Sequence, residues 1–90
     1  MSNIVITGSS KGIGFGLAKE FASRGHQVMI AGSNQASVDE ALAKLTEHAQ
    51  WIKASVCDVS QADQVQALWD AAITAFGSVD IWINNAGLAR

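Results

Sequence analysis

The residues from Ile4 to Gly14 combine a short apolar run with a series of glycines, and they constrain the fold more than any other stretch. Ile4, Val5 and Ile6 are β-branched and continuous, which is typical of a strand buried on both faces. Glycines follow at positions 8, 12, 14 and 16, and then a helical apolar pattern begins. This combination favours an anion site, because free backbone N–H groups and the positive end of the helix dipole point into the turn.

The glycine spacing, G-x3-G-x-G, differs from two common phosphate-binding patterns. It is not G-x-G-x-x-G, and a Walker A loop would need Gly-Lys-Ser/Thr where the chain has Ile13. The alternative is a tight strand-to-helix turn with no ligand. Four glycines in nine residues cost more backbone entropy than a plain turn requires, so we expect a phosphate-binding turn.

Apolar runs and amphipathic patterns alternate along the rest of the chain. The order βαβαβαβ predicts an α/β fold with a doubly wound parallel sheet and the strand order 3-2-1-4. Ligands are expected beyond the carboxyl ends of the strands, where the order reverses between strands 1 and 4. The predicted strands span residues 4–6, 27–31, 51–56 and 79–83, and the predicted helices span residues 12–24, 37–49 and 60–76.

Local signals predict where the second and third helices begin and end. Ser37 with Glu40 is typical of a capping box, and Ser60 with Asp63 predicts the cap of the third helix. Gly77 is expected to end that helix, and Gly25 is expected to follow the first helix in the left-handed conformation. We also expect Cys57 and the three tryptophans to pack in the core.

Length and composition exclude several function classes. Ninety residues form one small domain or part of a larger one, and a net charge of −2 argues against nucleic acid as the main partner. The single cysteine and the isolated His26 and His48 offer no metal site. No basic leader precedes the first strand and no apolar run approaches about 20 residues, so we expect a cytoplasmic protein without a membrane contact.

Three motifs, in order, resemble the short-chain dehydrogenase/reductase family. Thr7–Gly14 is similar to the family's T-G-x-x-x-G-x-G turn, Asp58-Val59 to its D-V step, and residues 84–87 to its N-N-A-G segment. The resemblance covers essentially the whole chain but only the front half of the family's domain. It implies a Rossmann-type fold, present in part, in which residues 1–90 form the dinucleotide-binding half with no second domain.

The resemblance also implies roles for individual residues. The glycine turn would hold the pyrophosphate, with the Ile13 N–H at the helix start. Asp58 would accept a hydrogen bond from the adenine amino group, and Val59 would pack on the ring. Asp58 is alternatively an ordinary turn or cap residue, and Asn84 and Asn85 are alternatively turn residues that tie the last strand to its neighbours. The implied cofactor-binding residues are Gly8, Ser9, Ser10, Lys11, Gly12, Ile13, Gly14, Ser33, Asp58, Val59, Asn84, Ala86 and Gly87.

The end of the second strand bears on which dinucleotide is bound. An NAD site usually has an acid there, hydrogen-bonded to the ribose, whereas this chain has Gly32. Ser33 follows, where NADP-using members often carry Arg, and its hydroxyl can donate to a phosphate. Lys11 adds a positive charge inside the turn, although it is alternatively a solvated surface lysine. We expect NADP(H), with NAD(H) less favoured.

The resemblance places the family's catalytic Ser, Tyr and Lys beyond residue 90, and the chain contains no tyrosine. We therefore expect no catalytic residue and no turnover in this chain alone. One hypothesis is the NADP-binding part of an oxidoreductase that transfers hydride between nicotinamide and a carbonyl or alcohol. The other is a non-catalytic dinucleotide-binding or chain-pairing module, or a truncated gene remnant.

The fourth predicted strand is expected to form an open edge of the sheet. Ile81, Trp82 and Ile83 are apolar, and the strand lacks the Pro or Lys that protects natural edges. Its one charge, Asp80, lies near its beginning. We expect two copies to join antiparallel through residues 79–83, giving a homodimer with a continuous eight-stranded sheet.

Overall fold

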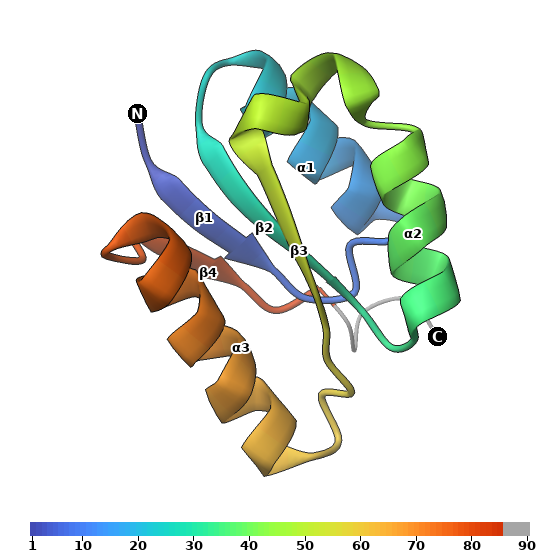
Figure 1. Cartoon of the computed structure of the whole chain (residues 1–90), viewed down its shortest axis with the longest axis vertical. Coiled ribbons are helices and arrows are strands. Elements are labelled where there is room, and N and C mark those ends of the chain that lie inside the picture. The colour runs from blue at the N-terminus through green and yellow to red at the C-terminus, as the bar shows by residue number, and fades with distance from the viewer. Residues whose placement is uncertain (86–90) are drawn as a thin grey trace.

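Helices and parallel strands alternate through residues 1–85, which are the residues that the computed structural model describes (Figure 1). The elements are β1 (Asn3–Ile6), α1 (Gly12–Ser23), β2 (Gln27–Gly32), α2 (Gln35–Ala43), the 3₁₀ helix η1 (Thr46–Trp51), β3 (Ile52–Val56), α3 (Ala62–Phe76) and β4 (Ile81–Ile83).

The sheet has the order β3-β2-β1-β4, and every adjacent pair is parallel, which confirms the predicted fold class and topology. In register, Val5 of β1 lies between Met29 of β2 and Trp82 of β4. Helices α1 and α2 lie on one side of the sheet and α3 lies on the other (Figure 1). The neighbouring strands β1 and β4 therefore end side by side, at the point where the strand order reverses.

The two central strands, β1 and β2, bury both of their faces, as the continuous apolar runs predict. Ile4 and Ile6 of β1 pack toward α1 and α2, in a cluster that includes Ala18. Val5, between them, packs on the opposite face against Leu68 and Ala72 of α3. Since successive side chains of a strand point to opposite faces, one apolar strand supplies two cores.

Asn34 caps α2, so the predicted capping box at Ser37 and Glu40 is wrong. The Asn34 Oδ1 accepts a hydrogen bond from the Ser37 N–H over 2.8 Å, which is the usual N-cap interaction. Because α2 begins at Gln35, Ser37 already lies in its first turn. The Glu40 carboxylate instead accepts from the Lys44 ammonium group over 3.2 Å.

The second helix also ends earlier than the predicted residue 49. The N–H groups of Lys44 and Leu45 donate to carbonyls three residues earlier, those of Ala41 and Leu42, over 3.1 Å each. This tighter pattern ends the α-helix, and η1 follows it. Leu45 is fully buried at the bend, so core packing overrides the helical pattern at this point.

The predicted cap of α3 is also wrong. The N-cap residue is Gln61, whose side chain makes no capping hydrogen bond. Ser60 is used in the preceding turn, where its N–H and its hydroxyl donate to the Asp58 Oδ1 over 3.0 and 2.7 Å. Gly77 ends the helix, as predicted, and it does so in the left-handed conformation with φ of 83°.

β4 is shorter than the predicted strand, which spans residues 79–83. Asp80 precedes β4. Its N–H donates to the Asn3 carbonyl over 2.8 Å, and its Oδ2 accepts from the Asn3 N–H over 2.7 Å.

One tryptophan is more exposed than predicted. Trp69 is 42% exposed, so it lies at the margin of the core and not inside it. Trp51 and Trp82 are partly buried against the two core clusters.

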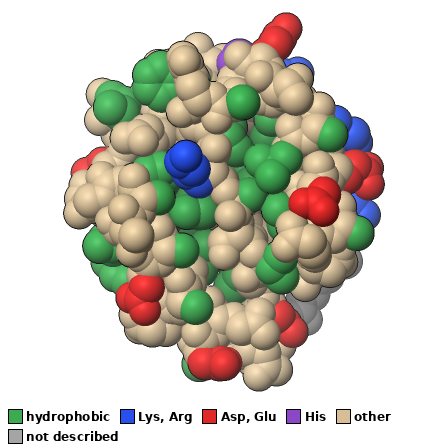
Figure 2. Space-filling view, in the orientation of Figure 1, with side chains coloured by type: hydrophobic (Ala, Val, Ile, Leu, Met, Phe, Trp, Pro, Cys, Tyr) green, Lys and Arg blue, Asp and Glu red, His purple; other side chains and the backbone are tan. Residues whose placement is uncertain are grey.

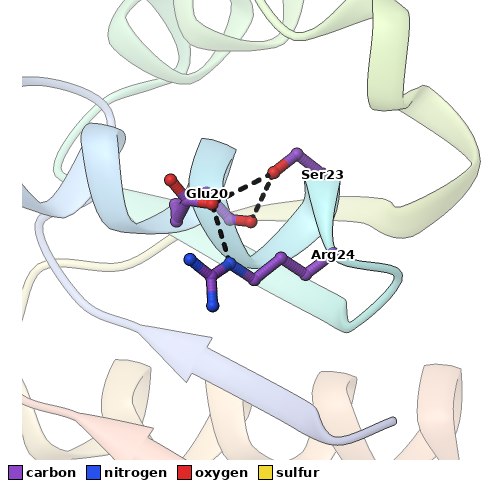
Figure 3. Close-up of polar contacts among 3 residues, drawn as sticks. All are labelled: Glu20, Ser23 and Arg24. Carbon is purple, nitrogen blue, oxygen red and sulfur yellow. Dashed lines mark hydrogen bonds and ion pairs between the residues drawn. The ribbon is translucent and has the colours of Figure 1, made fainter.

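The C-terminal end of α1 carries a group of three polar residues (Figure 3). Arg24 Nε donates to Glu20 Oε2 over 2.9 Å, and Ser23 Oγ donates to the Glu20 carbonyl over 2.7 Å. The hydrogen bond and positive charge of Arg24 lower the pKa of Glu20 below its ordinary value. Because these side chains are exposed, water and salt screen the ion pair, and its contribution to stability is small.

Figure 2 shows the surface of the molecule in the orientation of Figure 1. Hydrophobic side chains gather near the middle of this face, and acidic side chains lie mainly around its rim.

Within residues 1–85, none of the helices has the length and apolar character needed to cross a membrane.

We predict that Asn34→Ala lowers the free energy of unfolding by about 1 kcal/mol, because the substitution removes the cap of α2. Ser37→Ala is the matched control, and we expect it to change stability by less than about 0.5 kcal/mol. Urea unfolding followed by circular dichroism measures both values. A larger loss for Ser37→Ala than for Asn34→Ala would contradict the assignment of the cap.

Candidate functional site

A hollow of about 340 Å³ lies where the turns after the four strands meet. The sequence predicts this meeting of turns at the carboxyl ends of the strands. The β1–α1 turn supplies one wall, the end of β2 a second and the turn after β3 a third. The lining residues are Gly8, Ser10, Lys11, Gly12, Ile13, Gly32, Ser33, Cys57, Asp58, Val59 and Asn85.

The backbone of the β1–α1 turn needs glycine at two of its positions. Gly8 has φ of 60° and Gly12 has φ of 63°, in the left-handed region that other residues rarely adopt. No atom lies within 4 Å of the place where a β-carbon of Gly12 would be, so a side chain would have room there. Glycine is needed at this position because of its positive φ.

Gly14 is required for space. A β-carbon at this position would lie 2.5 Å from the Asn85 Nδ2 and 2.8 Å from the Gly8 carbonyl oxygen, closer than atoms approach in real structures. Helix α1 can therefore begin directly against the ends of β1 and β4. Gly16, by contrast, is exposed and has no atom within 4 Å of its missing β-carbon.

Ser9 holds the glycine turn against the sheet. It is fully buried and does not line the hollow. Its hydroxyl donates to the Ile6 carbonyl over 2.7 Å and accepts from the Ala31 N–H over 2.9 Å. Its own N–H donates to the Ala31 carbonyl over 2.8 Å. Ser9 thus joins the glycine turn to β2, and its neighbours Ser10 and Lys11 reach the hollow.

Asn85 joins the segment after β4 to the glycine turn. Its side-chain Nδ2 donates to the Gly8 carbonyl over 3.0 Å, and its N–H donates to the Thr7 hydroxyl over 3.1 Å. The residue is only 6% exposed. Asn85 is not among the cofactor-binding residues predicted from the sequence. The alternative prediction, that it ties the last strand to its neighbours, agrees with these two hydrogen bonds.

Asn84, which the resemblance places at the cofactor, does not line the hollow. Its side chain is exposed, and its Oδ1 accepts from the Trp82 Nε1 over 2.8 Å. Ala86 and Gly87 lie outside the described residues.

Cys57 lines the hollow, which the sequence did not predict. A cysteine in an apolar run indicates only that the residue packs in the core.

The N-terminus of α1 opens into the hollow and has the features of an anion site. Lys11 is the N-cap residue, and its side chain makes no capping hydrogen bond. The first N–H groups of a helix have no partner inside it, and the helix dipole makes this end positive. Lys11 is exposed and forms no ion pair with the described residues, so its charge remains available.

Asp58 presents a carboxylate at the opposite wall. Its Oδ1 accepts the two hydrogen bonds from Ser60, which lower the pKa of the carboxyl group below its ordinary value. Asp58 is therefore ionised at neutral pH and accepts hydrogen bonds only. Its N–H is held by the Gln64 Oε1 over 2.8 Å, which ties this wall to the first turn of α3.

Cys57 forms an uncharged part of the wall next to Asp58. The thiol is 4% exposed, and burial, followed by the charge of Asp58, raises its pKa above the ordinary value. It is protonated at neutral pH and behaves as a small apolar group. The described residues contain no cluster of three metal-ligating side chains.

The end of β2 is closely packed against the glycine turn. A β-carbon at Gly32 would lie 3.0 Å from the Ser10 hydroxyl and 3.1 Å from a methyl group of Val38. An acidic side chain would fit at this position only if Ser10 moved. Gly32 thus leaves the β2 wall uncharged, with the exposed Ser33 beside it.

The family profile described as short chain dehydrogenase matches residues 2–90. Chlorophyll(ide) b reductase NOL, chloroplastic, from Oryza sativa subsp. japonica is 44% identical over 87 residues, which are 94% of this chain and 25% of that protein. The chain belongs to the short-chain dehydrogenase family, and it spans about a quarter of the length of this curated relative.

Solved structures agree with this assignment. A variant of actinorhodin polyketide ketoreductase with NADPH has a TM-score of 0.85 and 27% identity, and the match covers 93% of this chain and 33% of the other. The 3-ketoacyl-(acyl-carrier-protein) reductase from Brucella melitensis complexed with NADH has a TM-score of 0.79 and 34% identity, and the match covers 88% and 31% of the two chains. These neighbours support a nicotinamide dinucleotide as the cofactor of the family.

We predict opposite effects for two glycines of α1. Gly14→Ala should lower the free energy of unfolding by about 1–3 kcal/mol, because the new β-carbon overlaps Asn85 and Gly8. Gly16→Ala should raise it by about 0.5–1 kcal/mol, because alanine restricts the unfolded chain and meets no atom in the folded one. Urea unfolding of both variants gives the comparison. Equal effects would contradict the close packing at the start of α1.

Proposed function

We propose that the hollow binds NADP(H) in preference to NAD(H), and that this chain is the cofactor-binding part of an oxidoreductase. In the complete protein the bound dinucleotide supplies hydride transfer between nicotinamide and a carbonyl or alcohol. The observation that carries the proposal is the glycine turn, which opens the uncapped N-terminus of α1 into a hollow that also presents Lys11 and Asp58.

The residues present fit a dinucleotide in two places. The pyrophosphate would lie at the start of α1, where Gly12 and Gly14 leave the backbone accessible and the helix dipole favours negative charge. The adenine would lie between Asp58, which accepts a hydrogen bond from its amino group, and the exposed apolar side chain of Val59. Asn85 would act indirectly, by holding the glycine turn through the Gly8 carbonyl.

The preference for NADP(H) rests on the charges around the end of β2. Gly32 brings no carboxylate to repel a 2′-phosphate, and the Ser33 hydroxyl beside it can donate a hydrogen bond. Lys11 lines the same hollow and has no acidic partner among the described residues. The two solved neighbours, one with NADPH and one with NADH, support either cofactor, so this preference depends on the chain's own residues.

A second candidate is a dinucleotide-binding module without chemistry. In the oxidoreductase, a tyrosine would exchange the proton with the carbonyl or alcohol oxygen. The gene downstream of codon 90 separates the candidates. A reading frame that continues into Ser and Tyr-x-x-x-Lys supports the oxidoreductase, and a stop codon supports the module.

We predict that the 90-residue chain binds NADPH about fivefold or more tightly than NADH, as measured by titration calorimetry at one salt concentration. Lys11→Ala should weaken NADPH binding about fivefold and NADH binding less than about twofold, because it removes a charge near the additional phosphate. Lys19→Ala, an exposed lysine on the same helix, is the matched control and should change neither affinity. Equal affinities of the wild type for the two dinucleotides would contradict the proposed preference.

A further inference from the structure

The Asp58 carboxylate, at the wall of the hollow, is held through one of its two oxygens. Oδ1 accepts a hydrogen bond from the Ser60 N–H over 3.0 Å and another from the Ser60 hydroxyl over 2.7 Å. Neither of these bonds involves Oδ2. Both oxygens of an ionised carboxylate accept hydrogen bonds, so Oδ2 keeps its capacity for a donor outside this turn.

The backbone that carries this carboxylate is fixed at the start of α3. The Asp58 N–H donates to the Gln64 Oε1 over 2.8 Å, and the Asp58 carbonyl accepts from the Gln61 N–H over 3.0 Å. Because the backbone is held at both of its polar groups, the side-chain torsions of Asp58 decide where Oδ2 lies. The two hydrogen bonds from Ser60 restrict these torsions.

Ser60 lies outside the lining of the hollow, so it would act on a ligand there only through Asp58. Its side chain is exposed, and the N-cap of α3 is the next residue, Gln61. An exposed hydroxyl can always donate to water, yet this one donates to the Asp58 carboxylate. The wall residue between them, Val59, is 44% exposed and lines the hollow.

We propose that Ser60 is a positioning residue that makes the hollow selective for a purine with an amino group, because it holds the Asp58 carboxylate with Oδ2 available to accept from that group. The inference rests on the proposed binding of a dinucleotide in the hollow. It concerns the base of that dinucleotide, and it does not depend on which of the two nicotinamide dinucleotides is preferred.

Adenine and hypoxanthine differ in the groups that such a carboxylate would meet. Adenine carries an amino group at position 6, whereas hypoxanthine carries a carbonyl there and an N–H on the neighbouring ring nitrogen. A carboxylate held in place faces the hypoxanthine carbonyl as a second acceptor, which is unfavourable. A carboxylate that is free to turn can accept from the ring N–H of hypoxanthine instead. Restricting Asp58 therefore increases the discrimination between the two bases.

Titration calorimetry of the 90-residue chain with NADPH and with its hypoxanthine analogue tests this role. We expect the wild type to bind NADPH about tenfold more tightly than the analogue, and Ser60→Ala to reduce this ratio to about threefold. Ser60→Thr keeps the hydroxyl and should retain the ratio. Ser23→Ala is the matched control, because Ser23 is an exposed serine whose hydroxyl donates to Glu20, at the other end of α1 from the hollow. It should leave the ratio unchanged.

A second measurement needs no ligand. The hydrogen bonds from Ser60 hold the pKa of Asp58 below its ordinary value, so Ser60→Ala should raise this pKa, as followed by NMR titration of the carboxyl carbon. Ser60→Thr and Ser23→Ala should leave it unchanged, and circular dichroism of all the variants should stay native.

The outcomes separate this proposal from the proposed function. An equal base ratio in the wild type and Ser60→Ala, or a pKa of Asp58 that this substitution does not move, would overturn the role of Ser60 while dinucleotide binding stands. The comparison is repeated with NADH and its hypoxanthine analogue, so the test also holds for a chain that prefers NADH. A wild type that binds none of the four dinucleotides would overturn both proposals.

Discussion

Three segments of the chain meet in van der Waals contact at the carboxyl ends of β1 and β4. The Asn85 side chain donates to the Gly8 carbonyl, and both groups occupy the space where Gly14 has no β-carbon. The turn after β1, the start of α1 and the segment after β4 are therefore fixed relative to one another. The hollow depends on this contact, because these segments supply Gly8, Ser10–Ile13 and Asn85 to its lining.

The rest of the fold supports this contact from both sides of the sheet. Ser9 joins the glycine turn to β2 through Ala31, and Gln64 joins the turn after β3 to α3 through the Asp58 N–H. These hydrogen bonds are made by the side chains of Ser9 and Gln64, neither of which lines the hollow. In the proposed function, Lys11, Asp58 and the first N–H groups of α1 contact the dinucleotide. The site thus separates residues that hold the walls from residues that present charge.

The sequence predicted the sheet, its order and the meeting of the turns, because the β-branched runs and the glycine spacing are local signals of strong physical origin. Helix ends were predicted poorly at Ser37 and Ser60, since several neighbouring residues can cap and only packing decides among them. The second helix was predicted too long because burial of Leu45 ends it. Asn85 was predicted only as an alternative, as a turn residue that ties the last strand to its neighbours, because its place at the hollow depends on a contact with Gly8, 77 residues away in the sequence.

Two-dimensional NMR of the isotope-labelled 90-residue chain, titrated with NADPH, tests the central claim that the hollow at the glycine turn is the ligand site. The account predicts that the largest amide shifts occur at Gly8, Lys11–Gly14, Ser33 and Asp58, with η1 unchanged. Shifts confined to α3, or no shift at about 1 mM NADPH, would contradict it.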